Sequence, residues 1–186
     1  MTFEEKIKNN IRLNYEDAIK LYDMDLLQLG EMASKIREDK FGRKTYYNVN
    51  RHINPTNICK DVCQFCAYSA SRKNPNQYTM THNEILDTVD NSVKNGIKEV
   101  HIVSAHNPNT GLEWYLEVFK KIKDKYPSLH VKALTAAEIH FLSEEYNKSY
   151  EEIINLMIDY GVDSMPGGGA EIFDERGEKR EFVEGK

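Results

Sequence analysis

Short runs rich in β-branched or aromatic residues alternate with longer amphipathic segments, and this alternation narrows the fold more than any other feature of the chain. The short runs predict strands. They occupy residues 45–53, 99–104, 130–135 and 162–165. The segments between the later runs carry apolar residues at helical spacing and predict helices. They occupy residues 81–96, 112–126 and 136–160, the last with a break near Asn147. Strands separated by helices indicate a parallel sheet with right-handed crossovers.

The residues before this alternation predict a separate helical segment. Apolar residues recur at helical spacing up to about residue 40, and Gly42 marks the end of the pattern. Asn14, followed three residues later by Asp17, has the spacing of a helix N-cap pair. Because the stretch 23–25 interrupts the pattern, we expect two or three helices here.

These patterns divide the chain into three parts. We expect a helical segment at 1–44, a strand–helix region at 45–173 and a charged, poorly ordered tail at 174–186. A closed eight-stranded α/β barrel needs about 200 residues or more. The strand–helix region has room for about four units, so it forms either an open sheet or half of a barrel.

Composition and charge exclude several classes of function. The chain has 186 residues and a net charge of −5, with Lys and Arg spread along it, which argues against a nucleic-acid partner. It has neither an apolar run of about 18 residues nor an apolar N-terminal stretch of the signal-peptide type. We therefore expect a cytoplasmic protein with no membrane partner, whose thiols stay reduced.

All three cysteines of the chain lie within eight residues, at Cys59, Cys63 and Cys66. An odd number of clustered thiols in a reducing compartment indicates a metal site and not a disulfide framework. Thiolates suit zinc or an iron–sulfur cluster. Three cysteines leave one iron of a four-iron cluster free to bind a small molecule. The alternatives are a zinc site completed by His52 and a set of reactive thiols.

The spacing C-x-x-x-C-x-aromatic-C after the first predicted strand resembles the signature of radical S-adenosylmethionine (SAM) enzymes. Several further blocks resemble the aminodeoxyfutalosine synthase family within that superfamily. These blocks are residues 50–58, 65–68, 101–103, 106–108, 112–115, 132–139 and 166–173. The resemblance covers about residues 13–175. It implies the α/β fold of the N-terminal half of a radical SAM TIM-type barrel, with about four parallel strands preceded by N-terminal helices.

The resemblance also implies a reaction and its cofactors. A 4Fe-4S cluster would cleave S-adenosyl-L-methionine to methionine and a 5′-deoxyadenosyl radical, with electrons from a donor such as flavodoxin or ferredoxin. In this family the radical adds to the double bond of 3-[(1-carboxyvinyl)oxy]benzoate and yields aminodeoxyfutalosine, a step of menaquinone biosynthesis. The chain would then be a transferase with a small-molecule substrate.

Candidate site residues follow from the same blocks and from the strand ends, where ligands of α/β sheets bind. Cys59, Cys63 and Cys66 are the expected metal ligands. The candidate cofactor-binding residues are Phe65, Ser104, Glu138 and Gly168, and the candidate catalytic residues are His52 and His106. Each of these two groups also has a structural interpretation, because turns, helix starts and strand ends use the same residue types.

The resemblance ends near Asp174, whereas members of the family continue through the rest of the barrel. We therefore expect a shortened chain whose activity on its own is impaired. Two alternatives stay open: a related radical SAM cyclase of the futalosine pathway and an inactive metal-binding fragment. The glycine block 167–169 and residues 112–115 favour the synthase over the cyclase.

Overall fold

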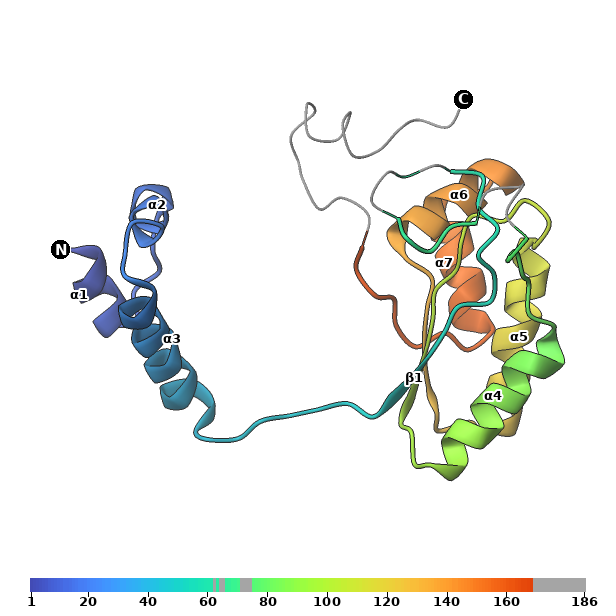
Figure 1. The fold of residues 1–186 in the computed structure, drawn as a ribbon, viewed down its shortest axis with the longest axis horizontal. Coiled ribbons are helices and arrows are strands. Elements are labelled where there is room, and N and C mark those ends of the chain that lie inside the picture. Colours follow the sequence, from blue (N-terminus) through green and yellow to red (C-terminus); the bar gives the residue numbers. More distant parts are fainter. Residues whose placement is uncertain (62, 64–65, 71–74, 169–186) are drawn as a thin grey trace. The chain divides into compact units, whose positions relative to one another are not determined.

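The computed structural model describes residues 1–61, 63, 66–70 and 75–168. The chain consists of two compact units, Met1–Tyr47 and Asn48–Lys186, which are described separately below (Figure 1). The expected boundary between residues 44 and 45 falls close to this division. The tail expected at 174–186 lies outside the described residues.

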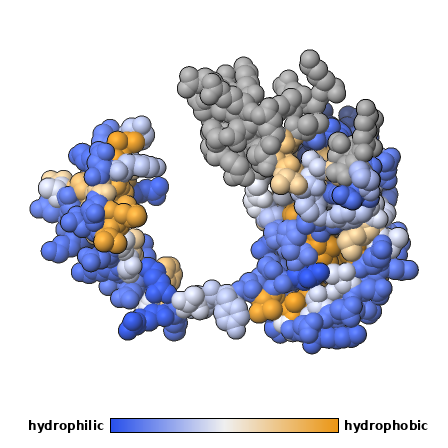
Figure 2. Space-filling model, viewed as in Figure 1, coloured by the Kyte–Doolittle hydropathy of each residue, from blue (hydrophilic) through white to orange (hydrophobic). Residues whose placement is uncertain are grey.

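The first unit contains three helices, within the expected number. They are α1 (Phe3–Lys8), α2 (Tyr15–Leu21) and α3 (Leu26–Phe41). Thr2 and Asn14 open α1 and α2 with capping boxes, and Gly42 ends α3 in a left-handed conformation with φ of 63°. Asp17 is the only buried residue within the three helices, and it pairs with Lys6. Apolar side chains of this unit therefore stay largely accessible, as the orange areas over α1–α3 in Figure 2 show.

The second unit is built on a parallel sheet of three strands in the order β1-β2-β3. These are β1 (Asn50–Ile53), β2 (Glu99–Ile102) and β3 (His130–Ala133). His52, His101 and Lys132 are register partners across the sheet. The sequence correctly predicts all three strands, although β1 begins five residues later than expected.

The fourth expected strand, at 162–165, forms a single parallel bridge between Ser164 and Lys132. The Ala133 N–H donates to the Ser164 carbonyl at 3.0 Å, and the Asp163 N–H donates to the Val131 carbonyl at 2.8 Å. Pro166 follows directly and has no N–H with which to extend the ladder. The segment thus lies in the place of a fourth strand without forming one.

Four helices accompany the sheet. They are α4 (His82–Lys94), α5 (Leu112–Lys125), α6 (Ala136–Tyr146) and α7 (Tyr150–Asp159). Capping boxes at Thr81 and Ser149 open α4 and α7, as the sequence predicts. Asn147 adopts a left-handed conformation after α6, which confirms the expected break in the 136–160 segment. No described helix is both long and apolar enough to cross a bilayer.

The two faces of the sheet differ in chemistry because successive side chains of a strand point to opposite sides. Ile53, Val100, Ile102, Val131 and Ala133 lie on one face and are buried in the core. That core also contains apolar side chains of all four helices, namely Ile85, Val89, Phe119, Ile122, Ile139, Leu142, Ile153 and Met157. The opposite face is polar. It carries Asn50, His52, Glu99, His101, His130 and Lys132.

Candidate functional site

The cysteines lie on the loop that leaves the carboxyl end of β1. Two isolated bridges close this loop at its base, Ile58 with Ala70 and Thr56 with Thr79. The Ala70 N–H donates to the Asn57 carbonyl at 2.8 Å, so the two ends of the cysteine segment are fixed to each other. The loop therefore projects from the edge of the sheet at which ligands of parallel α/β folds bind.

Asn107 fixes the following β2 loop to the base of the cysteine loop. Its side chain is 1% exposed, and its Nδ2 donates to the hydroxyls of Thr56 at 3.0 Å and Thr79 at 3.1 Å. The Asn109 N–H donates to Asn107 Oδ1 at 2.9 Å, so the side-chain oxygen of Asn107 also has a hydrogen-bond partner. Sequence reasoning did not single out this residue, because its partners are distant along the chain.

The three cysteines differ in exposure: Cys59 and Cys63 are half-buried, and Cys66 is exposed. Burial raises the pKa of the Cys59 thiol, while backbone N–H groups of Asp61 and His106 that point at its sulfur oppose the rise. Burial also raises the pKa of Cys63, and the Asp61 carboxylate adds to that effect. A bound cation favours the thiolate and would reverse these shifts.

His106 contacts the cysteine loop through both its backbone and its side chain. Its carbonyl accepts the Lys60 N–H at 3.0 Å, and its Nδ1 hydrogen-bonds the Asp61 carboxylate. The imidazole stacks on Phe141 of α6, with ring centroids 4.9 Å apart and planes 9° apart. Burial lowers the pKa of His106 despite the nearby Asp61 carboxylate. The sequence identified His106 as a candidate but not its partners Asp61 and Phe141, which come from two other segments.

Glu138 connects the loops that follow β2 and β3. Its side chain is 4% exposed, and its two oxygens accept the backbone N–H groups of Ser104 and Thr135, each at 2.7 Å. Burial raises the pKa of Glu138 to about 7, although these N–H groups oppose the rise. The helix-start pattern Thr135–Glu138 is a capping box, so the structural interpretation of Glu138 has direct support in its contacts.

The other candidate residues take separate positions at the same edge. The Ser104 hydroxyl oxygen is buried close to the Tyr115 side chain, and Gly168 has φ of 114° beside the Thr135 side chain. His52 is exposed, its Nε2 donates to Asn54 Oδ1 at 2.8 Å, and its ring lies 4.9 Å from that of His101. Phe65 lies outside the described residues. The binding and catalytic roles of all these residues stay predictions.

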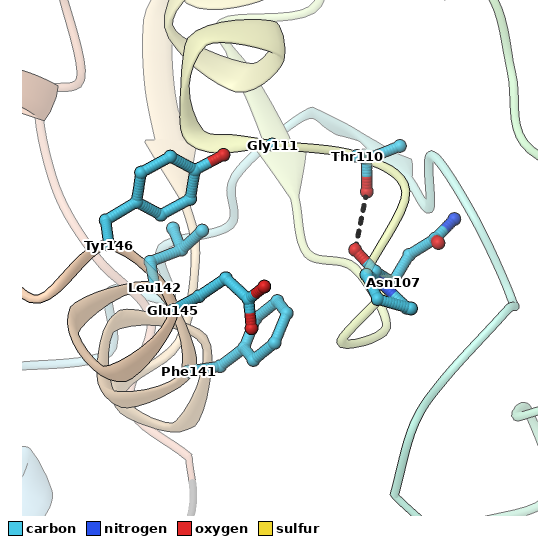
Figure 3. Close-up of a pocket in the computed structure, with 8 residues that line it drawn as sticks. Asn107, Thr110, Gly111, Phe141, Leu142, Glu145 and Tyr146 are labelled. Carbon is cyan, nitrogen blue, oxygen red and sulfur yellow. Dashed lines mark hydrogen bonds between the residues drawn. The ribbon is translucent and has the colours of Figure 1, made fainter.

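Two pockets lie beside the loops that follow β1 and β2. One, of about 330 Å³, is lined by Cys59, Lys60 and the Pro108–Asn109 segment, among others. The second, of about 210 Å³, lies between the 107–111 loop and α6, where Phe141, Glu145 and Tyr146 face Thr110 and Asn107 (Figure 3). The Tyr146 hydroxyl accepts the first N–H of α5 at 2.8 Å, and only a glycine at 111 leaves room for it. The pocket beside Cys59 has the size of a small-molecule site.

The cysteines fit an iron–sulfur cluster better than they fit one ion. Two thiolates of a single zinc ion lie at most about 4.6 Å apart, twice the Zn–S bond. In the part of the chain that the structure describes, no such close group contains all three cysteine sulfurs. A cluster holds its thiolates farther apart and accepts N–H bonds on sulfur, as Cys59 receives here. His52, the histidine predicted to complete a zinc site, does not belong to any such close group of donors among the described residues.

Comparison with known proteins identifies the class. The family model of the radical SAM superfamily matches residues 53–185, so the chain belongs to this superfamily. Membership implies a 4Fe-4S cluster and S-adenosylmethionine. The X-ray structure of the FeFe-hydrogenase maturase HydG from Carboxydothermus hydrogenoformans has the same fold, with a TM-score of 0.62 at 16% identity. The match covers 88% of this chain and 46% of that chain.

Among curated proteins, the chain is 36% identical over 173 residues to the aminodeoxyfutalosine synthase of Thermus thermophilus, covering 92% of this chain and 46% of that protein. It is 31% identical to the cyclic dehypoxanthine futalosine synthase of Halalkalibacterium halodurans, with 92% and 47% covered. It is 33% identical to a 5-amino-6-(D-ribitylamino)uracil–L-tyrosine 4-hydroxyphenyl transferase of Cyanothece sp., with 79% and 40% covered. The chain thus spans about half the length of these relatives.

Proposed function

We propose that this chain carries the cluster-binding part of an aminodeoxyfutalosine synthase. Such an enzyme joins the adenosyl group of S-adenosyl-L-methionine to 3-[(1-carboxyvinyl)oxy]benzoate in menaquinone biosynthesis. The main support is the cysteine loop at the carboxyl edge of a parallel sheet, in a chain that is 36% identical to the Thermus thermophilus synthase.

Cys59, Cys63 and Cys66 would hold the 4Fe-4S cluster, which supplies the electron that cleaves S-adenosylmethionine. Asn107 and the closed loop base hold these cysteines at the sheet edge. Glu138 holds the Ser104 backbone in the loop after β2, and Gly168 lies next to the Thr135 side chain after β3. We assign Phe65, Ser104, Glu138 and Gly168 to cofactor binding as proposals.

His52 and His106 are the proposed catalytic candidates. His52 lies on the polar face of the sheet with His101 and Lys132, and burial lowers the pKa of His101, so that imidazole is neutral near pH 7. A substrate with two carboxylates finds hydrogen-bond donors on this face. A flavodoxin or ferredoxin would be the electron donor.

A second candidate is the cyclisation reaction of the cyclic dehypoxanthine futalosine synthases, to which the chain is also similar. A third is transfer of the 4-hydroxyphenyl group of L-tyrosine, as the name of the Cyanothece relative states. Residues 112–115 and the glycine block 167–169 favour the synthase over the cyclase.

The test begins with anaerobic reconstitution of the full chain with iron and sulfide. We expect about four irons per chain, cluster absorbance, and release of methionine after reduction with S-adenosylmethionine. A chain that forms no cluster absorbance in a zinc-free reconstitution would contradict the proposed chemistry. The Cys66→Ser variant is the control, because it removes one cluster ligand from an exposed position.

The reaction is then identified by supplying each substrate separately. An adenosyl adduct of 3-[(1-carboxyvinyl)oxy]benzoate supports the synthase. Free 5′-deoxyadenosine as the sole nucleoside product with this substrate argues against it. A 4-hydroxyphenyl adduct formed from L-tyrosine and 5-amino-6-(D-ribitylamino)uracil would instead establish the transferase.

A further inference from the structure

Three metal-donor side chains, two from the cysteine loop and one from the loop after β2, lie close together. Cys59 and Asp61 follow β1, and His106 follows β2. One ligand atom of each, the Cys59 sulfur, an Asp61 carboxylate oxygen and a His106 ring nitrogen, lies within 4.8 Å of the other two. Among the described residues, this is the group of three donors that meets this distance, and it includes neither Cys63 nor Cys66.

This donor set matches the preferences of a single divalent transition ion. Zinc binds thiolate sulfur at about 2.3 Å, imidazole nitrogen at about 2.0–2.1 Å and carboxylate oxygen at about 2.0–2.2 Å. Ligands of one ion therefore lie up to about 4.4 Å apart, close to the spread of this group. The ion would take the place of the proton in the hydrogen bond between Asp61 and His106, whose two atoms would separate to bind it. Three protein ligands leave a fourth position for water.

The three donors are held together without an ion. Backbone N–H groups of both Asp61 and His106 point at the Cys59 sulfur. The His106 imidazole bonds the Asp61 carboxylate and stacks on Phe141, which sets the plane of the ring. Its side chain is 17% exposed and that of Asp61 is 31% exposed, so an ion can reach the site from solvent.

One nearby positive charge opposes a cation at this site. The Lys60 ammonium lies 4.4 Å from the centre of the Phe141 ring, against which His106 also packs. The Asp61 carboxylate and a Cys59 thiolate together carry two negative charges, so the donor set outweighs this single cation.

We propose that Cys59, Asp61 and His106 form a mononuclear site for a divalent transition ion such as Fe²⁺ or Zn²⁺, which is used when the 4Fe-4S cluster is absent. Cys59 cannot ligate both at once, so the ion and the cluster exclude each other. Zinc at this site therefore slows cluster assembly by occupying Cys59. The proposal concerns the chain before it carries a cluster and does not depend on which substrate the enzyme uses.

The test uses the full chain with Cys63→Ser and Cys66→Ser together, which removes two cluster ligands and leaves the proposed site intact. Anaerobic titration with Co²⁺ is expected to show one bound ion per chain and a thiolate-to-cobalt absorption band. Adding Cys59→Ser should abolish the band. Absence of the band from the double variant would overturn the proposal.

Two further variants in the same background address the other ligands. Asp61→Asn and His106→Phe should each weaken Co²⁺ binding at least about tenfold, and the phenyl ring keeps the stack on Phe141. His140→Gln is the matched control, since His140 lies on the same helix as Phe141 and bonds Tyr150 instead. Equal Co²⁺ affinity in the His106→Phe and His140→Gln variants would refute the site. Trp114 fluorescence verifies that each variant is folded.

Competition in the chain with all three cysteines tests mutual exclusion. One equivalent of Zn²⁺ during reconstitution should lower the iron content of the native chain. The His106→Phe chain should retain more iron under the same conditions, because zinc has lost a ligand that the cluster does not use. If zinc lowers the iron content of both chains equally, exclusion through this site is wrong.

Discussion

Helix α3 has 16 residues and buries none of them, whereas α5 has 14 residues and buries six. Both helices have apolar residues at helical spacing, and α3 ends at Gly42 while α5 ends just before Tyr126 and Pro127. The difference lies in their surroundings, because α5 packs in one core with the strands, α4 and α7, whereas within its own unit α3 is accompanied by two short helices. Local sequence rules thus form both helices, but tertiary packing stabilises only one of the two units strongly.

The largest expected contrast concerns the metal site. Cys66→Ser in the α/β unit should reduce cluster iron nearly to zero, because it removes one of the three proposed ligands. Met32→Ala in α3 should leave the iron content unchanged. Iron and sulfide analysis after anaerobic reconstitution measures both. A loss of iron in the Met32→Ala chain would show that the helical unit takes part in cluster binding.

The second contrast is in stability. Phe119→Ala removes a fully buried ring from the α/β core and should lower the free energy of unfolding by about 3–5 kcal/mol. Met32→Ala, at a half-buried position, should cost about 1 kcal/mol or less. Urea titration followed by fluorescence of Trp114, the single tryptophan, reports on the α/β unit. A shift of the Trp114 transition by Met32→Ala would show that the unfolding of the two units is coupled.

The third contrast is in pH dependence and uses two glutamates at equivalent helix positions. The pKa of buried Glu138 is raised to about 7, so the folded chain binds a proton that the unfolded chain has released. Stability from this group is therefore present at low pH and is lost as pH rises from about 4.5 to about 7, at about 1.4 kcal/mol per unit.

Glu138→Gln should remove this dependence. Glu84 is its matched control, because it occupies the same capping-box position in α4, is exposed, and has a lowered pKa. Urea titrations of the native, Glu138→Gln and Glu84→Gln chains at several pH values measure the difference. Parallel curves for the native and Glu138→Gln chains would show that Glu138 does not titrate in this window.

The smallest contrast involves the N-cap residue of one helix in each unit. Thr81→Ala should destabilise the α/β unit by about 1 kcal/mol, because α4 loses the side chain that accepts the Glu84 N–H. Thr2→Ala removes the same bond from α1 and should leave the Trp114 transition unchanged. Amide hydrogen exchange should instead speed up in α1 alone. Slower or unchanged exchange there would mean that the Thr2 cap contributes nothing.

Sequence patterns predicted the elements well because their causes are local. The capping pairs at Thr81 and Ser149, the break at Asn147 and the stop at Gly42 each depend on residues within one turn. The segment 162–165 was only partly anticipated. Its alternation suits a strand, but Pro166 and the glycines after it limit pairing to one bridge.

The candidate site also combines features that the sequence predicts with contacts that only the fold reveals. The cysteine spacing and its place after β1 are sequence features, and they were enough to predict an open iron–sulfur site. The partners of His106 could not be predicted, because Asp61 and Phe141 lie 45 and 35 residues away along the chain and meet it only in the fold. The same holds for Asn107 with Thr56 and Thr79.

The sequence by itself determined which segments are helices and strands, and that three thiols share one loop, because backbone propensity, capping and ligand spacing act over a few residues. Only the tertiary structure decided that α5 is enclosed in one core with the strands, α4 and α7, and that Glu138 accepts two backbone N–H groups from different loops. It alone also brought Cys59, Asp61 and His106 together. These outcomes depend on parallel strands ending at one edge, which places loops far apart in the chain side by side.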